Sequence, residues 1–372
     1  MGSSSFNYSN FINNLNHPKM SREEKLNELE KTKAGVKGLV DSGIKKVPNI
    51  FISPNVQQNE STDQTCQTDK KIPVIDLRGI ENEQQRGQIV NELLEASKKW
   101  GMFQLLNHGL PAETIHAMLD CVQKFNEQPV ELKSEFYTRD EGRKVQYRLS
   151  LHRVTQTAFW KDTITCRFEG PDDLQACPAV CRKPMSEYLK YMIKLKDTVS
   201  ELLSEALGLN SNHLKMMQCL DSQKLNCHYY PACPEPSLVM GTPKHSDPYF
   251  FTVLVHNDID GLQVLHENQW IDVKPVEGAV IANIGDMLQL VSNDIFHSAE
   301  HRVLTRSVGP RLSVACFFCP TYKNKDRAYG PVKELVADGG NPVYRETSQA
   351  EYVKCFIPKG NAGFKALSQF RL

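Results

Sequence analysis

Two separated segments of the chain contain residue types that can hold a divalent cation. His245 and Asp247 stand two positions apart, and His301 lies far downstream. On a β-strand, residues at i and i+2 point to the same face, so an imidazole and a carboxylate could bind one ion together. His301 would supply a third ligand. An isolated His-x-Asp has a simpler interpretation as a polar pair at a strand end, so the prediction depends on its neighbours.

The proposed donor set and its neighbours favour a particular chemistry. Two imidazoles and one carboxylate on one side of an octahedron leave three positions open, which is typical of non-haem Fe(II) sites. The set contains no cysteine, so zinc-finger and iron–sulfur spacings do not fit. Arg311 and Ser313 offer a guanidinium and a hydroxyl on one expected strand face, and Tyr230 offers a phenol. A guanidinium is suited to binding a carboxylate.

The order and spacing of these motifs, with the segment 283–286, resemble the plant 2-oxoglutarate/Fe(II)-dependent dioxygenases. The resemblance covers about residues 70–360 and includes the segments 72–77 (IPVIDL) and 100–109 (WGMFQLLNHG). Segments 227–234 (CHYYPACP) and 261–266 (GLQVLH) are most similar to one subgroup. That subgroup holds deacetoxyvindoline 4-hydroxylase and the homologues of 1-aminocyclopropane-1-carboxylate oxidase.

The resemblance implies roles for individual residues. It makes Fe(II) the metal, 2-oxoglutarate the cosubstrate and ascorbate the reductant, with succinate and CO2 released. The implied Fe(II) ligands are His245, Asp247 and His301, and the implied 2-oxoglutarate contacts are Arg311, Ser313 and Tyr230. The expected substrate contacts are Phe317, Tyr249, Phe250 and Trp160, with core packing as the alternative for Phe317.

The expected reaction is hydroxylation of a C–H bond in a small plant specialised metabolite, such as an alkaloid, a phenolic or another ring compound. The same iron centre could instead perform desaturation, epoxidation or demethylation. Oxidation of 1-aminocyclopropane-1-carboxylate, with ascorbate and without 2-oxoglutarate, is a rival hypothesis. A non-catalytic binding protein on the same fold is another.

Several other polar residues near these motifs are expected to have no ligand role. His108, His256 and His266 are interpreted as structural, and His297 as a surface residue or a neighbour of the metal ligands. His228 stands where many relatives carry Asn beside the cosubstrate, although His is usual in the nearer subgroup. Ser246, between two of the ligands, is expected to face the opposite side of the strand and to matter little.

The elements that must position these residues change in type along the chain. Ser21 to Glu24 form a capping-box pattern, and helices are expected over about 84–99, 111–125 and 185–207. The span 135–180 is expected to be irregular. The resemblance implies that it lines or covers the substrate cavity, and an ordinary loop is the alternative. After residue 222, short strands are expected at 251–255, 261–265, 270–273, 279–284, 301–305 and 311–318. Many short strands predict a sandwich or barrel.

The resemblance specifies the fold as mainly β: a double-stranded β-helix, or jelly roll, packed by flanking α-helices. Four parts are expected along the chain. They are an N-terminal extension with a helix and a polar linker (1–70), an α/β part (71–215), the Fe(II)/2-oxoglutarate core (216–330) and a C-terminal helical or lid segment (331–372).

Bulk composition limits the partners of the protein. The 372 residues include 44 basic and 44 acidic side chains, so the net charge is zero and no basic stripe indicates nucleic acid. No apolar run reaches the roughly 18 residues of a membrane span, and no signal-peptide pattern opens the chain. Eleven cysteines lack regular pairing, and Cys316 and Cys319 are predicted to be buried thiols. We expect a cytoplasmic monomer that meets a small-molecule substrate and O2.

Overall fold

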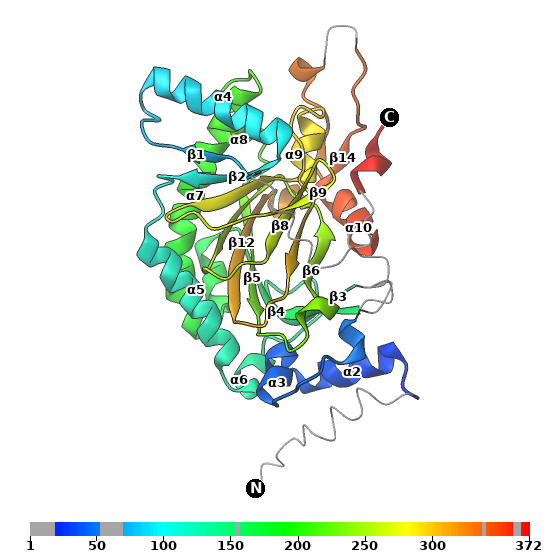
Figure 1. Cartoon of the computed structure of the whole chain (residues 1–372). Coiled ribbons are helices and arrows are strands. Elements are labelled where there is room, and N and C mark those ends of the chain that lie inside the picture. The colour runs from blue at the N-terminus through cyan, green and yellow to red at the C-terminus, as the bar shows by residue number, and fades with distance from the viewer. Residues whose placement is uncertain (1–18, 53–69, 153–156, 337–339, 360–365) are drawn as a thin grey trace.

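The computed structural model describes residues 19–52, 70–152, 157–336, 340–359 and 366–372. Two β-sheets face each other at the centre of the molecule (Figure 1). The larger sheet has the order β1 (Val74–Asp76), β2 (Met102–Leu106), β10 (Val280–Ile284), β7 (Phe251–His256), β12 (Arg311–Cys319), β5 (Ser222–Tyr230), β4 (Thr157–Phe168), β3 (Val145–His152). The smaller has the order β6 (Met240–His245), β11 (His301–Leu304), β8 (Leu262–His266), β9 (Gln269–Asp272). This arrangement agrees with the predicted jelly roll.

Alternation along the strands of the larger sheet separates a core face from a cavity face. On β12, the even-numbered residues enter the main hydrophobic core: Leu312, Val314, Cys316 and Phe318. The odd-numbered residues line a cavity between the sheets: Arg311, Ser313, Ala315 and Phe317. Both faces of β12 are buried, which explains why this strand is an almost continuous apolar run in the sequence.

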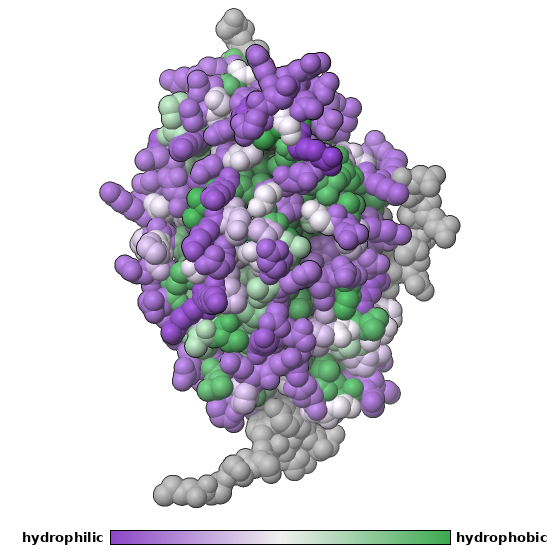
Figure 2. Space-filling view, turned by 90° about the vertical axis from the view of Figure 1, so that its left-hand side faces the viewer, coloured by the Kyte–Doolittle hydropathy of each residue, from purple (hydrophilic) through white to green (hydrophobic). Residues whose placement is uncertain are grey.

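Helices cover the core face of the larger sheet (Figure 1). They are α4 (Glu83–Lys99), α5 (Ala112–Glu127) and α7 (Ala179–Ala206). The predicted apolar stripe of α7, including Met185, Met192 and Val199, is buried. This helix begins at Ala179, earlier than expected, and continues through Pro184. The surface on this side is mostly hydrophilic, with apolar residues in small scattered groups (Figure 2).

The prediction of an irregular span over 135–180 was wrong. Strands β3 and β4 form a long antiparallel pair there, and β4 also pairs with β5. Nearly every residue of β4 is buried, because the cavity covers one face and the N-terminal helices and the main hydrophobic core together cover the other. From Thr163 to Phe168 polar and apolar residues alternate strictly, but the adjacent polar residues Lys161 and Asp162 interrupt that pattern in the middle of the strand. The larger sheet also takes strands from both sides of the expected boundary at 215/216.

The N-terminal segment packs on the outer face of β4. Its helices are α2 (Arg22–Thr32), which begins with the predicted Ser21–Glu24 capping box, and α3 (Gly35–Asp41). A second hydrophobic cluster, including Val36, Phe51 and Trp160, joins them to the sheet. The expected polar linker lies almost wholly outside the described residues.

At the other end of the chain, α10 (Gln349–Lys359) follows a small two-stranded sheet of β13 (Ala328–Tyr329) and β14 (Thr347–Ser348). Val353, Phe356 and Ile357 of α10 line the cavity. Cys316 and Cys319 are buried free thiols, as predicted. Among the described residues, no helix is both long and apolar enough to cross a membrane.

Candidate active site

The structure brings the three predicted metal ligands together. His245 ends β6 and His301 begins β11, and the pairing of these strands sets the two residues opposite each other. Asp247 lies just beyond the end of β6 rather than on it. Each imidazole Nε2 lies 3.8 Å from Asp247 Oδ1. Ligand atoms of the three residues all lie within 4.8 Å of one another, which is close enough for one ion.

Backbone carbonyls orient both imidazoles. His245 Nδ1 lies 2.9 Å from the Pro243 carbonyl oxygen, and His301 Nδ1 lies 3.0 Å from that of Ala299. A carbonyl only accepts, so each Nδ1 carries a proton, and Nε2 is the ring nitrogen left to bind a metal. Burial, followed by the neighbouring His301, lowers the pKa of His245 to about 3. A neutral imidazole is the form that binds a metal ion.

Asp247 is held through one oxygen, and its other oxygen faces the imidazoles. Oδ2 accepts hydrogen bonds from the Thr252 hydroxyl at 2.7 Å and the Asn283 amide at 2.5 Å. Burial opposes ionisation, but the imidazoles of His301 and His245 and these two donors keep the pKa of Asp247 below its usual value. Oδ1 is the oxygen nearest both imidazoles and is the one placed to bind the ion.

Arg311 is a buried cation whose guanidinium lacks a hydrogen-bond partner among the described residues. It is 2% exposed, and Nε and both Nη atoms are unsatisfied. Such a group is costly unless a ligand completes it. The guanidinium carbon lies 5.3 Å from the ring centroid of Tyr230, and Ser313 lines the same cavity. These donors fit a carboxylate of a ligand that also reaches the metal ligands.

Sequence reasoning missed Lys161, a second buried cation at this end of the cavity. It is 5% exposed, and its Nζ donates to Thr242 Oγ1 at 2.8 Å. Thr242 Oγ1 lies 3.0 Å from the Tyr230 hydroxyl, and Lys161 Nζ lies 5.8 Å from the Tyr230 ring centroid. Burial, with a smaller effect of Arg311, lowers the pKa of Lys161 to about 7. Lys161 and Thr163 stand two positions apart on β4, and this spacing could have placed Lys161 on the cavity face, but that strand was not predicted.

The cavity has a volume of about 340 Å³ and is lined by residues of both sheets and of α10. Of the four predicted substrate contacts, Phe317 and Tyr249 line it, with ring centroids 5.0 Å apart.

Trp160 and Phe250 do not line the cavity, which corrects the prediction. Trp160 points to the outer face of β4, where it packs 5.0 Å from Phe51 and donates to the Pro231 carbonyl. Phe250 is fully buried in the main core, 5.2 Å from Tyr329.

The three histidines that were interpreted as structural have structural surroundings. His108 Nε2 lies 3.1 Å from the Gly278 carbonyl oxygen, His256 Nδ1 lies 2.6 Å from that of Asn257, and His266 stacks on Trp100 at 3.7 Å. His228 lines the cavity, with its Nδ1 2.9 Å from Thr163 Oγ1.

Ser246 makes a contact that the sequence did not indicate. Its hydroxyl donates to Asp286 Oδ2 at 2.9 Å. Tyr352 of α10 donates to the same oxygen at 2.7 Å. Burial raises the pKa of Asp286 to about 6. A short hydrogen-bonded chain therefore joins α10 to the turn between two of the candidate metal ligands.

Comparison with known proteins places this site in a family. Residues 221–320 match the model of the 2OG-Fe(II) oxygenase superfamily, and residues 72–185 match the model described as "non-haem dioxygenase in morphine synthesis N-terminal". The chain belongs to the 2OG-Fe(II) oxygenase superfamily. It is a 2-oxoglutarate-dependent dioxygenase, and the predicted family, fold class and use of Fe(II) and 2-oxoglutarate are confirmed.

Full-length relatives support this assignment. The chain is 43% identical over 357 residues to "1-aminocyclopropane-1-carboxylate oxidase homolog 1" of Arabidopsis thaliana, covering 95% of this chain and 97% of the relative. It is 43% identical over 371 residues to deacetoxyvindoline 4-hydroxylase of Catharanthus roseus, covering 96% and 92%. A crystal structure of JOX2 in complex with 2OG, Fe and JA superposes with a TM-score of 0.78 at 29% identity, covering 91% and 97%.

Proposed function

We propose that His245, Asp247 and His301 bind Fe(II) and that Arg311 binds the distal carboxylate of 2-oxoglutarate. Ser313 and Tyr230 would donate hydrogen bonds to that carboxylate, and Lys161 would add a second positive charge. The observation that carries this proposal is the buried guanidinium without a partner, in the same cavity as the three metal-ligand side chains. A dicarboxylate that chelates the metal at one end would satisfy the guanidinium at the other.

We propose further that the enzyme hydroxylates a C–H bond of a small plant specialised metabolite with a ring. Bound Fe(II) and 2-oxoglutarate would supply the oxidising power, consuming O2 and releasing succinate and CO2. The protein would hold neutral imidazoles and an ionised carboxylate in place and position the substrate. The aromatic pair Phe317 and Tyr249 supports a ring-shaped substrate.

Binding of Fe(II) and 2-oxoglutarate can be tested without a known substrate. Under anaerobic conditions, the two together should give the visible metal-to-ligand charge-transfer band of such complexes. His301→Ala or Asp247→Ala should abolish both the band and turnover while circular dichroism shows a retained fold. A band of unchanged intensity in either variant would refute the ligand assignment.

Arg311→Met should weaken 2-oxoglutarate binding about tenfold to hundredfold, because charge-assisted hydrogen bonds contribute about 1.5–3 kcal/mol. Titration of the same band with 2-oxoglutarate measures the change. Arg78→Met, at an exposed residue that pairs with Asp76 outside the cavity, is the control and should leave the titration unchanged.

The reaction outcome is separated by product mass and stoichiometry. Hydroxylation adds one oxygen atom to the substrate, whereas desaturation removes two hydrogens. Oxidation of 1-aminocyclopropane-1-carboxylate would proceed without succinate release.

A cytoplasmic monomer assisted by ascorbate also remains our proposal, supported for the compartment by the buried free thiols.

A further inference from the structure

The cavity has two cationic ends, and 2-oxoglutarate would occupy one of them. At one end, the register of β12 with β5 places Arg311 opposite Tyr230. At the other end, Lys224 of β5 lies between Phe317 of β12 and Arg167 of β4. Arg311 and Phe317 are six residues apart on one strand, so the two ends are separated by roughly 20 Å along it. The second cationic group is therefore distinct from the proposed cosubstrate contacts.

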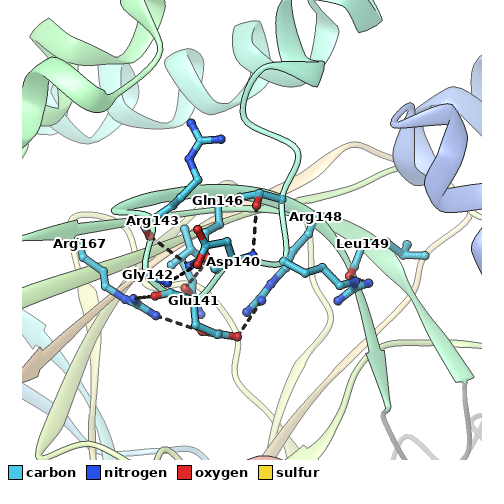
Figure 3. Close-up of polar contacts among 12 residues, drawn as sticks. Asp140, Glu141, Gly142, Arg143, Gln146, Arg148, Leu149 and Arg167 are labelled. Atoms are coloured by element: carbon cyan, nitrogen blue, oxygen red, sulfur yellow. Dashed lines mark hydrogen bonds and ion pairs between the residues drawn. The ribbon is translucent and has the colours of Figure 1, made fainter.

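Among the described residues at this second end, positive charges outnumber negative ones. Arg148 Nη1 lies 3.1 Å from Glu141 Oε1, and Arg167 Nη2 lies 3.3 Å from Glu141 Oε2. Figure 3 shows the two guanidinium groups approaching this carboxylate from opposite sides. Burial raises the pKa of Glu141, but these arginines and Lys224 lower it more. The pKa therefore stays below its usual value, and the carboxylate is ionised. One carboxylate thus faces two guanidinium groups and a lysine.

Lys224 is the member of this group without a carboxylate partner among the described residues. Its Nζ donates to the Tyr249 hydroxyl at 2.8 Å and lies 5.2 Å from that ring's centroid. This partner is a hydroxyl and not a carboxylate, so the contact does not balance the lysine charge. Arg139 also lines the cavity, but it is paired with Glu30 on α2.

We propose that the substrate of this dioxygenase carries a carboxylate that binds at Lys224 and Arg167, with its ring against Phe317 and Tyr249. The inference rests on the proposed function, because it places the substrate in the same cavity as the cosubstrate. The two aromatic rings and the apolar side chains of α10 suit the uncharged part of such a molecule. A half-buried ammonium and a guanidinium suit its anionic end.

Equilibrium dialysis with two matched probes tests the inference. The probes are 3-phenylpropionate and 3-phenylpropionamide, which share the ring and chain and differ in charge. The protein is held anaerobically with Fe(II) and saturating 2-oxoglutarate, so that the cosubstrate end is occupied. The acid should bind at least tenfold more tightly than the amide. Equal affinity, or no measurable binding of the acid, would overturn the inference.

Variants locate the bound acid. Lys224→Met should remove the preference for the acid, and Lys224→Arg should retain it because the charge is kept. Lys190→Met is the matched control, since Lys190 pairs with Glu187 on α7 outside the cavity, and it should change nothing. A preference that survives Lys224→Met but disappears in Arg311→Met would put the acid at the cosubstrate end and refute the inference.

The charge-transfer band keeps this result separate from the proposed function. If the band forms but the probes show no charge preference, the inference about the substrate fails and the oxygenase proposal stands. If the band does not form, the proposed Fe(II) and 2-oxoglutarate contacts fail first.

Discussion

At the scale of single residues, the candidate iron ligands are oriented before any metal arrives. Carbonyl oxygens two residues before each histidine fix the protonated ring nitrogen, and two donors fix one carboxylate oxygen of Asp247. Partners of this kind commonly account for a 10–100-fold difference in metal affinity. The precision of the site therefore depends on residues that do not touch the ion.

Thr252→Val tests this dependence. The substitution keeps the shape of the side chain and removes the hydroxyl that donates to Asp247 Oδ2. We expect the dissociation constant for Fe(II), measured by anaerobic titration, to rise about tenfold or more. Thr32→Val, on α2 and outside the cavity lining, is the control. Equal affinities in the two variants would show that the hydroxyl has no role in orienting the ligand.

The lowered pKa of Lys161 predicts that 2-oxoglutarate binding depends on pH. The carboxylate should prefer the protonated lysine, whose pKa in the free protein is about 7. Below pH 7 the charge is already present and affinity should be constant. Above pH 7 binding must take up a proton, so the dissociation constant should rise by up to tenfold per pH unit.

The groups around Lys161 do not obscure this effect. Burial lowers the pKa of Arg311, but a guanidinium stays charged in proteins. Burial also keeps the pKa of the His228 imidazole well below its usual value, so His228 stays neutral. Tyr230 stays protonated because burial raises its pKa. Titrations of the charge-transfer band from pH 6 to 9 measure the dependence, and Lys161→Met should flatten it. A wild-type profile that is already flat over this range would contradict the prediction.

At the scale of elements, strand β4 connects the cavity to the N-terminal helices. Lys161 faces the cavity, and the adjacent Asp162 faces α3. The Asp162 carboxylate accepts from the Val36 and Lys37 backbone N–H groups, each at 2.8 Å, at the start of that helix. Gly35 precedes them at φ +69, and an added Cβ there would lie 2.2 Å from Asp162 Oδ1.

Asp162→Ala should destabilise the fold by about 1–2 kcal/mol, because a helix start loses its acceptor and two backbone donors are left unsatisfied. Urea denaturation measures the change in the free energy of unfolding. Asp41→Ala is the control: it removes an exposed carboxylate that pairs with Lys37, and we expect less than about 0.5 kcal/mol. A similar small loss in both variants would show that Asp162 does not anchor the segment.

The same strand shows why the sequence predicted some features and not others. The convergence of His245, Asp247 and His301 followed from short motifs whose residue types are specific. The face on which a residue lies depends instead on where its strand lies and what covers it. The adjacent polar residues Lys161 and Asp162 interrupt the alternation along β4, so the strand was not predicted, Trp160 was placed in the cavity and Lys161 was missed. The prediction for Phe250 was wrong for a related reason. This residue precedes β7, and its side chain packs into the main hydrophobic core instead of the cavity.

At the scale of the whole molecule, the C-terminal helix completes a cavity that the two sheets leave incomplete. Val353, Phe356 and Ile357 supply one apolar wall, and Tyr352 is fully buried beside them. The Tyr352 hydroxyl bonds to Asp286, which also accepts from Ser246 between two of the candidate metal ligands. The Asp286 carboxylate therefore links the position of α10, which closes the cavity, to the turn that holds His245 and Asp247.

Tyr352→Phe should loosen this connection without emptying the core, because the ring remains and one hydrogen bond is lost, worth about 1 kcal/mol. A less firmly held α10 would position the substrate less well, so more 2-oxoglutarate would be consumed without product. We expect the ratio of succinate to oxidised product to rise, while the affinity for 2-oxoglutarate at the opposite end stays within about twofold. Tyr322→Phe is the control, because the Tyr322 side chain is 71% exposed. An unchanged ratio in Tyr352→Phe would show that α10 keeps its place through apolar packing alone.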